Sequence, residues 1–306
     1  AFSQNSCNFS VPGAGKTSIV YGAYAYLKNT DDLKKQVNKL VVFGPPSSFD
    51  AWEDEFNECF GRTTEIFRIT GDVSFRKKYE VLSGITIKEP EIILLTYNSI
   101  IKLKELLLEY LERNEVMLVC DEAHRTTGAT FEDQAESHFV KIHEDKYVEG
   151  KKRLYMTATP RIFGNKAKRK ADEGRVELAS MDDPEKYGKE FFNRGFNWAV
   201  ENNLLSDYKV VILAVDEGLV SSNLQKSLED GSELKLTDAT KIIGVYKALA
   251  KVGFDKKENE KLKPIKKALA FTQSIEISKI FEKEFERVIN EYVKNENIKN
   301  DNKVDL

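Results

Sequence analysis

The chain has 306 residues, of which 41% are hydrophobic and 32% are charged. This length corresponds to one large domain or two smaller ones, at about 100–200 residues per domain. Positive and negative residues nearly cancel, at 47 against 50, and the sequence pI is near 5.9. Simple basic nucleic-acid-binding domains have a pI above about 9, so any contact with nucleic acid must come from a local stripe of charge.

The remaining composition excludes several other classes of protein. The cysteines Cys7, Cys59 and Cys120 are far apart, so they predict neither a disulfide framework nor a zinc site. We see no apolar run of about 18 residues and no signal peptide, and we therefore expect a cytoplasmic protein without a membrane partner. The chain begins only nine residues before a phosphate-loop pattern, which suggests a fragment or a trimmed chain.

Short apolar runs alternate with amphipathic stretches through the first half of the chain. We expect strands at residues 7–11, 40–43, 65–69, 91–95, 116–120 and 153–156. We expect helices at residues 18–28, 49–60 and 100–113. Strands separated by helices predict a parallel sheet with helices on both faces. Ligands of such sheets bind at the carboxyl ends of the strands, where the motifs below fall.

The second half is less regular. Further strands are expected at residues 209–215 and 268–272, and further helices at 239–252 and 275–294. The polar residues 216–238 are interpreted as a linker or surface excursion. The charge run 255–263 is interpreted as a solvated loop.

Residues 10–17 read Ser-Val-Pro-Gly-Ala-Gly-Lys-Thr, between the first strand and the first helix. In such a loop, backbone amides at the helix N-terminus point at bound phosphates. We expect Lys16 to reach the β- and γ-phosphates of ATP and Thr17 to offer its hydroxyl to Mg²⁺. The alternative is a glycine-rich turn followed by Lys-Thr by chance; Ser10 stands where the general pattern has glycine. The residues expected to hold the nucleotide are Gly13, Ala14, Gly15, Lys16, Thr17 and Ser18.

Residues 119–125 read Val-Cys-Asp-Glu-Ala-His-Arg and follow an apolar strand. Hydrolysis of a γ-phosphate needs one carboxylate for the metal and a second group that orients the attacking water. We expect Asp121 to serve the Mg²⁺ and Glu122 to position and deprotonate water. With Lys16 they form the predicted catalytic set. The alternative interpretation is an acidic turn after a strand.

The phosphate loop together with Asp-Glu-Ala-His resembles the DEAH-type helicases and translocases of superfamily 2. Residues 155–160, Tyr-Met-Thr-Ala-Thr-Pro, resemble the motif that couples hydrolysis to movement in that family. The resemblance implies coupling roles for His124, Thr157, Ala158 and Thr159. It also implies a RecA-like P-loop NTPase fold that uses ATP and Mg²⁺.

Other segments resemble further motifs in the family's order. Residues 42–56 resemble motif Ia, especially of Swi2/Snf2-like members, and residues 94–99 resemble the strand-end motif that touches the nucleic-acid backbone. Residues 268–274 resemble the motif that opens the second RecA-like domain. Residues 45–48 and 96–99 of the first two segments, together with residues 126–128, would form a nucleic-acid rim. The implied contact residues are Pro45, Ser47, Thr96, Asn98 and Ser99.

Residues 157–216 narrow the resemblance. They are similar to the predicted-helicase family that includes the Type ISP (single-chain Type I-like) restriction enzymes. This similarity implies a motor on duplex DNA, with nuclease and methyltransferase domains on the same full-length chain. It implies a first RecA-like domain at residues 1–205, and a linker with the incomplete start of a second at 206–306.

One departure bears on activity. No Gln-Arg-x-Gly-Arg segment follows residue 274, so the motifs that carry the family's arginine finger are absent. An arginine finger contributes about 10³–10⁵ in rate, and we expect the chain alone to bind nucleotide weakly and hydrolyse it poorly. Two alternatives stay open: a Swi2/Snf2-like or RNA-directed helicase, and a non-hydrolysing nucleotide-binding module.

Four other features are weighed. Trp52 and Trp198 are interpreted as core anchors rather than base-stacking platforms. The basic residues 166–170 form either a phosphate-binding patch or a solvated helix face. Gln4 lies too close to the phosphate loop for the usual adenine-reading spacing.

Overall fold

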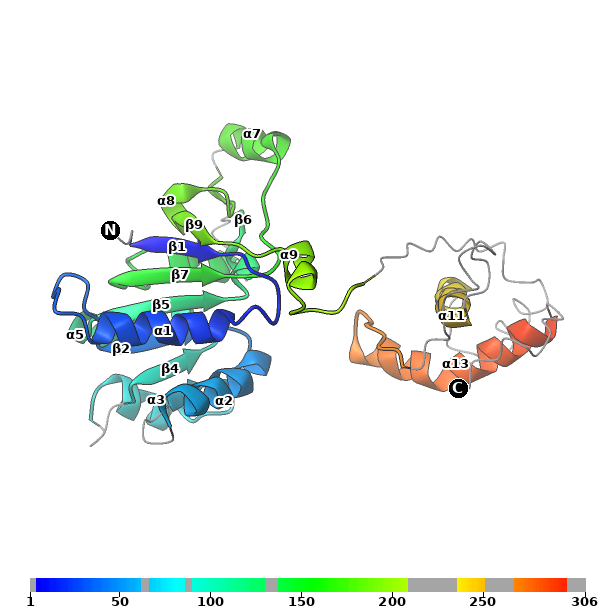
Figure 1. Ribbon diagram of the computed structural model, residues 1–306, viewed down its shortest axis with the longest axis horizontal. Coiled ribbons are helices and arrows are strands. Elements are labelled where there is room, and N and C mark those ends of the chain that lie inside the picture. Colours follow the sequence, from blue (N-terminus) through cyan, green and yellow to red (C-terminus); the bar gives the residue numbers. More distant parts are fainter. Residues whose placement is uncertain are drawn as a thin grey trace. The chain divides into compact units, whose positions relative to one another are not determined.

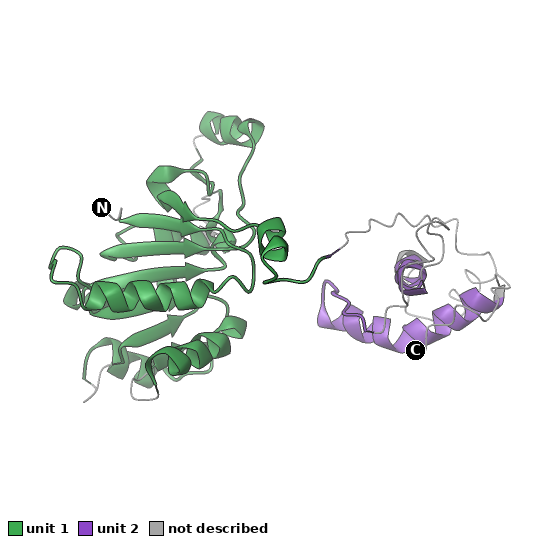
Figure 2. Ribbon diagram, in the orientation of Figure 1, with its two compact units in different colours: residues 1–207 green, residues 208–306 purple. Residues whose placement is uncertain are grey.

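The computed structural model describes residues 4–61, 66–85, 90–129, 137–174, 176–208, 236–250 and 267–295. The chain divides into two compact units, unit 1 at residues 1–207 and unit 2 at residues 208–306 (Figure 2).

Unit 1 contains a seven-stranded parallel sheet in the order β3-β4-β2-β5-β7-β1-β9 (Figure 1). Its strands are β1 (Asn5–Asn8), β2 (Lys39–Phe43), β3 (Ile66–Ile69), β4 (Ile92–Leu95), β5 (Val116–Asp121), β7 (Lys152–Met156) and β9 (Lys189–Phe192). The short strands β6 (Gly128–Ala129) and β8 (Leu178–Ala179) pair antiparallel beside it. The six strands expected in the first half are all present, within a few residues of their expected bounds.

Helices connect the strands. They are α1 (Lys16–Lys28), α2 (Phe49–Phe60), α3 (Phe75–Leu82), α4 (Ser99–Lys102), α5 (Lys104–Arg113), α6 (Ser137–Val140), α7 (Asn165–Glu173), α8 (Pro184–Tyr187) and α9 (Phe196–Glu201). Short 3-10 helices add η1 (Pro46–Ser48), η2 (Ala123–Thr126) and η3 (Lys141–His143).

The sheet separates two hydrophobic cores, because successive side chains of a strand point to opposite faces. Leu40 and Val42 of β2 pack with α1 and α2, and Val41 and Phe43 of the same strand pack with α3 and α5. The expected architecture, a parallel sheet with helices on both faces, is therefore confirmed, as the expected RecA-like P-loop NTPase fold requires.

Two expectations for unit 1 need correction, and one strand of the sheet was not expected. The helix expected at 100–113 is two helices, because Leu103 leaves the helical region at φ −122° and ψ 21°. Trp198 is 38% exposed and lies under the guanidinium of Arg194, so it is not a core anchor. The edge strand β9 was not expected. Gly188 precedes it at φ +75°, where a Cβ would lie 1.9 Å from the carbonyl oxygen of Asn5.

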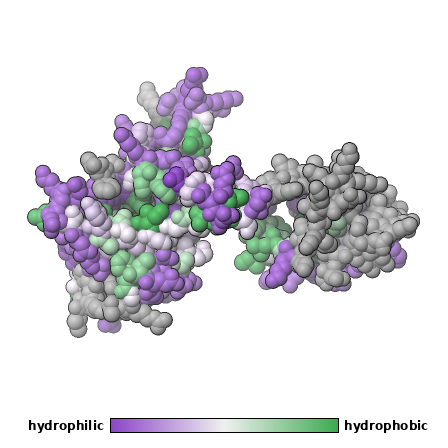
Figure 3. Space-filling model, in the orientation of Figure 1, coloured by the Kyte–Doolittle hydropathy of each residue, from purple (hydrophilic) through white to green (hydrophobic). Residues whose placement is uncertain are grey.

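One face of unit 1 carries a largely apolar hollow. It has a volume of about 710 Å³ and lies beside α1 over β1, β7 and β9. Hydrophobic residues gather over the strands on the face drawn in Figure 3. Ile19, Leu154 and the half-exposed Phe191 are among its lining residues.

Unit 2 has two described helices, α11 (Leu236–Ala250) and α13 (Ile275–Asn295), which pack through a small apolar core. The strand expected at 268–272 is wrong: these residues are irregular and exposed. A strand needs a neighbour for its backbone hydrogen bonds, and no described residue of unit 2 supplies one. The expectations for 209–215 and 255–263, and for most of 216–238, lie outside the described residues. No helix in the described ranges is long and apolar enough to span a bilayer.

The ring of His143 packs against the rings of Tyr155 and Tyr187. His143 Nε2 lies 3.0 Å from the Thr126 carbonyl oxygen, and its Nδ1 lies 2.8 Å from the Tyr155 hydroxyl. The Nε2–H therefore donates to Thr126 and the Tyr155 hydroxyl donates to Nδ1, which defines a neutral ring. Burial lowers the pKa of His143 to about 4, from a usual value of 6.5.

This shift predicts a pH dependence of stability. Since the pKa is depressed in the folded state, the stabilisation is complete above about pH 6.5 and is lost as the pH falls towards 4. Between these values His143 adds a slope that approaches about 1.4 kcal/mol per pH unit to the free energy of unfolding. Urea unfolding of wild type and His143→Gln between about pH 7 and pH 5 measures it. Equal slopes for the two proteins would contradict this assignment.

Candidate ATP site and nucleic-acid groove

Three polar segments meet at the carboxyl ends of the strands, because β5, β7 and β1 are adjacent and parallel (Figure 1). β1 leads into the phosphate loop, β5 ends at Asp121, and β7 leads directly to Thr157. Carboxyl ends of parallel strands form the ligand-binding edge of such folds. The sheet therefore brings the predicted loop, acidic box and Thr-Ala-Thr segment together.

The phosphate loop has the backbone that its glycines predict. Gly13 and Gly15 lie at φ +77° and φ +70°, a left-handed region that strains other side chains. Gly15 is the N-cap of α1, and no side chain caps its first turn. The first N–H groups of α1 are thus available to an anion. Lys16 Nζ donates to the carbonyl oxygens of Ser10 and Val11, at 3.0 Å each.

The serine in the first position of the loop has a structural reason. Ser10 is fully buried, and its hydroxyl donates to Asn8 Oδ1 at 2.7 Å. The Ser10 backbone N–H donates to the same oxygen at 3.1 Å. Asn8 therefore braces the start of the loop, a role that sequence reasoning missed.

Charge links the loop to the acidic box. Burial lowers the pKa of Lys16, while the carboxylates of Asp121 and Glu122 act in the opposite direction. The three side chains therefore lie within range of each other's charge. Thr17 is half-buried in the first turn of α1. The Ser18 hydroxyl donates to Glu55 of α2, so Ser18 offers the loop only its backbone N–H.

Asp121 is held from three sides. Its Oδ1 accepts the Glu122 backbone N–H at 3.0 Å, and its Oδ2 accepts the indole N–H of Trp52 at 3.0 Å. Its carbonyl oxygen accepts the Tyr97 hydroxyl at 2.8 Å. Each carboxylate oxygen keeps a further acceptor site, since an ionised carboxylate has about four.

Glu122 and His124 connect the acidic box to the Thr-Ala-Thr segment. Glu122 is left-handed at φ 50°, ψ 46°, a strain of about 1–3 kcal/mol of the kind that clusters at functional sites. His124 Nδ1 lies 3.3 Å from Glu122 Oε2 and 3.0 Å from Thr157 Oγ1. Burial lowers the pKa of His124, which favours a neutral ring. The buried Thr157 hydroxyl also accepts the Thr159 N–H at 3.1 Å, with Ala158 half-buried between them.

These residues fit an ATP–Mg²⁺ ligand. Uncapped backbone N–H groups and the Lys16 ammonium suit phosphates. The hydroxyl of Thr17 and the carboxylate of Asp121 are oxygen ligands, which Mg²⁺ prefers. Gln4 does not join the site: its side chain donates to Gly150 at the amino end of β1, away from the loop.

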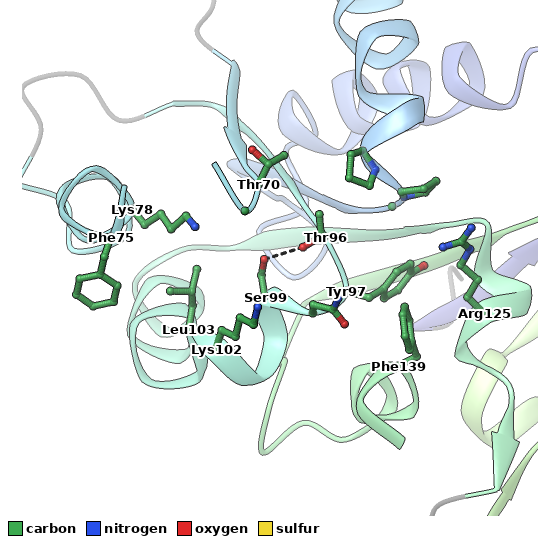
Figure 4. A pocket seen from close by; sticks show the side chains of 15 residues that line it. Thr70, Phe75, Lys78, Thr96, Tyr97, Ser99, Lys102, Leu103, Arg125 and Phe139 are labelled. Carbon is green, nitrogen blue, oxygen red and sulfur yellow. Dashed lines mark hydrogen bonds between the residues drawn. The ribbon is translucent and has the colours of Figure 1, made fainter. Parts of the chain in front are cut away.

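A second candidate site, a groove of about 400 Å³, also lies at the carboxyl ends of the strands (Figure 4). It is formed by residues 44–46 after β2, 70–71 after β3 and 96–99 after β4, with Arg125 after β5. Lys78, Lys102 and Arg125 line it, and none of its lining residues is acidic. The groove is therefore a local positive surface on a chain whose overall charge is slightly negative.

The groove contains four of the five predicted nucleic-acid residues: Pro45, Thr96, Asn98 and Ser99. Ser47 is exposed on η1 but is not among the lining residues. Ser99 is 7% exposed, and its hydroxyl bonds that of Thr96 at 3.0 Å, so it supports the turn.

The third segment predicted for the rim, residues 126–128, does not line the groove; the residue just before it does. Thr126 and Thr127 are buried, and their hydroxyls donate to the carbonyl oxygens of Ala123 and His124, while the exposed Arg125 lines the groove. Sequence reasoning missed Lys78, Lys102 and Arg125, because each is a single basic residue in a separate segment.

Comparison with known proteins identifies the family. The family described as "Type III restriction enzyme, res subunit" matches residues 6–162. The structure titled "ATP-dependent Type ISP restriction-modification enzyme LlaBIII bound to DNA" is 30% identical, with a TM-score of 0.69. The match covers 94% of this chain and 20% of LlaBIII, so the chain spans about a fifth of that protein. No curated protein matches.

Two more distant structures are also similar. A nuclease-deletion mutant of the Type ISP enzyme LlaGI with a DNA substrate mimic is 17% identical, with a TM-score of 0.41 over 96% of this chain and 28% of that one. The Sulfolobus solfataricus SWI2/SNF2 ATPase core with dsDNA is 16% identical, with a TM-score of 0.41 over 96% and 60%.

The predicted resemblance to superfamily 2 motors and to Type ISP restriction enzymes is confirmed. The phosphate loop, the acidic box and the Thr-Ala-Thr segment all fall inside the matched residues. The chain belongs to the family of Type III restriction enzyme res subunits.

Proposed function

We propose that this chain is the ATP-binding part of a motor that moves along duplex DNA within a restriction or phage-defence enzyme. The observation that carries the proposal is the convergence of phosphate loop, acidic box and Thr-Ala-Thr segment at the ends of β1, β5 and β7. The 30% identity with an ATP-dependent Type ISP enzyme bound to DNA supports the substrate class.

Each residue of the ATP site has a defined role in this proposal. Lys16 and the first N–H groups of α1 bind the phosphates. Thr17 and Asp121 hold Mg²⁺, which neutralises charge on the phosphate oxygens when bound. Glu122 orients a water molecule and accepts its proton.

The coupling residues act next to Glu122. His124 holds Glu122 and Thr157 together, so a change at Glu122 on hydrolysis reaches the Thr-Ala-Thr segment. Ala158 and Thr159, which follow Thr157 after β7, then transmit this movement to the chain beyond the strand.

Duplex DNA would lie in the positive groove. Lys78, Lys102 and Arg125 provide phosphate contacts, which position a duplex without reading its sequence. Tyr97 lines this groove and also donates to the Asp121 carbonyl oxygen, so DNA and metal sites share a residue.

The wider organisation is part of the same proposal. Residues 1–205 would form the first RecA-like lobe, and residues 206–306 a linker and the start of the second. Nuclease and methyltransferase domains would belong to the full-length protein, in the cytoplasm. Because no arginine-finger motif follows residue 274, we expect slow hydrolysis by this chain alone, and nucleotide binding is the better measurement.

Substitution at Lys16 tests the ATP site. Lys16→Ala removes charge-assisted hydrogen bonds of about 1.5–3 kcal/mol, so the Kd for ADP should rise by about 10–150-fold. Lys28→Ala is the control, because it removes the same charge from the other end of α1, where Lys28 pairs with Glu91. Calorimetric titration of each variant with ADP measures the change. Equal affinity of wild type and Lys16→Ala would contradict the site.

Salt-dependent binding tests the groove. Each of Lys78→Ala, Lys102→Ala and Arg125→Ala should weaken duplex DNA binding about equally for all sequences and lower the salt slope by about one. Fluorescence anisotropy over a series of salt concentrations measures both. Lys170→Ala on the exposed helix α7 is the control. It removes one charge from the other candidate basic patch, residues 166–170, and should leave DNA binding unchanged. DNA binding that depends on Lys170 and not on the groove cations would refute this assignment.

A further inference from the structure

Trp52 of α2 lies in the core between α1 and α2, and two contacts with Tyr21 of α1 fix its position. It is 1% exposed, and its ring meets Tyr21 edge to face at 5.5 Å. The Tyr21 hydroxyl donates to the Trp52 carbonyl oxygen at 2.6 Å. Both the ring and the backbone of Trp52 are therefore held by the helix that follows the phosphate loop.

Packing alone does not explain why this residue is tryptophan. Phe49 and Phe56 of the same helix fill the same core without a polar atom. A buried indole N–H needs an acceptor, and here it donates to Asp121 Oδ2 at 3.0 Å. Tryptophan differs from phenylalanine at this position by a hydrogen bond to the predicted metal ligand.

The bond completes the fixation of the carboxylate. The Glu122 N–H holds Oδ1 and the Trp52 N–H holds Oδ2, so donors on both oxygens define the plane of the group. Partners of this kind orient metal ligands before the metal binds, and their loss costs about 10–100-fold in metal affinity.

We propose that Trp52 is a positioning residue for Asp121, and that its indole N–H sets the Mg²⁺ affinity of the nucleotide site. The inference rests on the proposed function, because it assigns Asp121 to the metal. It also gives α2 a role: Trp52 lies about one turn into this helix, which follows η1 and the groove residues Pro45 and Pro46 in the chain.

Trp52→Phe tests the inference, because it keeps an aromatic ring and removes the donor. In the full chain with ADP, Mn²⁺ affinity measured by electron paramagnetic resonance should fall about 10–100-fold, while ADP affinity in the presence of EDTA stays unchanged. Tyr24→Phe is the matched control: it removes a polar atom from the same core, where Tyr24 bonds Asn38 and Glu91. It should leave Mn²⁺ affinity unchanged.

Three outcomes separate the two proposals. Equal Mn²⁺ affinity of wild type and Trp52→Phe overturns the inference and leaves the proposed function intact. A wild-type chain that binds no ADP overturns both. An equal loss of Mn²⁺ affinity in Trp52→Phe and Tyr24→Phe shows a general effect of core disruption and overturns the specific role of the indole.

A second measurement decides the matter if Trp52→Phe does not fold. The chain has two tryptophans, so Trp198→Phe leaves Trp52 as the sole indole. Adding Mg²⁺ to its ADP complex should change the emission of Trp52, because the acceptor of the indole N–H becomes a metal ligand. An unchanged emission spectrum at saturating Mg²⁺ would overturn the inference.

Discussion

The parallel ladder of β5, β7 and β1 sets the geometry on which the rest of the site depends. Asp121 pairs with Met156 across one ladder, and Asn8 pairs with the same Met156 across the other. The chain leaves all three strands at this level, so the acidic box, Thr157 and the phosphate loop begin side by side. A shift of one residue in either ladder would move each polar group to the wrong face of the sheet.

Asp121 is the point at which the two sites meet. Its carboxylate takes one hydrogen bond from Trp52 in the helix after Pro45 and Pro46, and its carbonyl oxygen takes another from Tyr97 in the groove. The two segments expected to touch DNA thus reach the expected metal ligand directly. On the other side, His124 joins Glu122 to Thr157. Short polar contacts within unit 1 therefore connect the groove, the expected metal ligand and the segment expected to couple hydrolysis to movement.

The sequence predicted the features that leave a local pattern. Apolar runs located β2, β4 and β5 most clearly, because buried parallel strands are almost continuously hydrophobic. The glycines beside Lys16 and the carboxylates after β5 located the candidate ATP site, since nucleotide chemistry constrains which residues can be used there.

The rest depends on contacts between distant segments, and no local pattern encodes them. The edge strand β9 is mostly exposed, so it lacks a hydrophobic signature. Lys78, Lys102 and Arg125 meet only after folding. Trp52 was correctly interpreted as a core anchor, but its partner Asp121 lies 69 positions away. The strand expected at 268–272 had the right composition, but no described strand lies beside it.

The most direct test of the account is where a metal and a nucleotide bind. A crystal structure of this chain with Mn²⁺ and ADP would place the metal by its anomalous scattering. The account predicts the Mn²⁺ between Thr17 Oγ1 and the Asp121 carboxylate, and the diphosphate on the N–H groups of residues 13–18. A metal held elsewhere, or a nucleotide bound away from the end of β1, would contradict it.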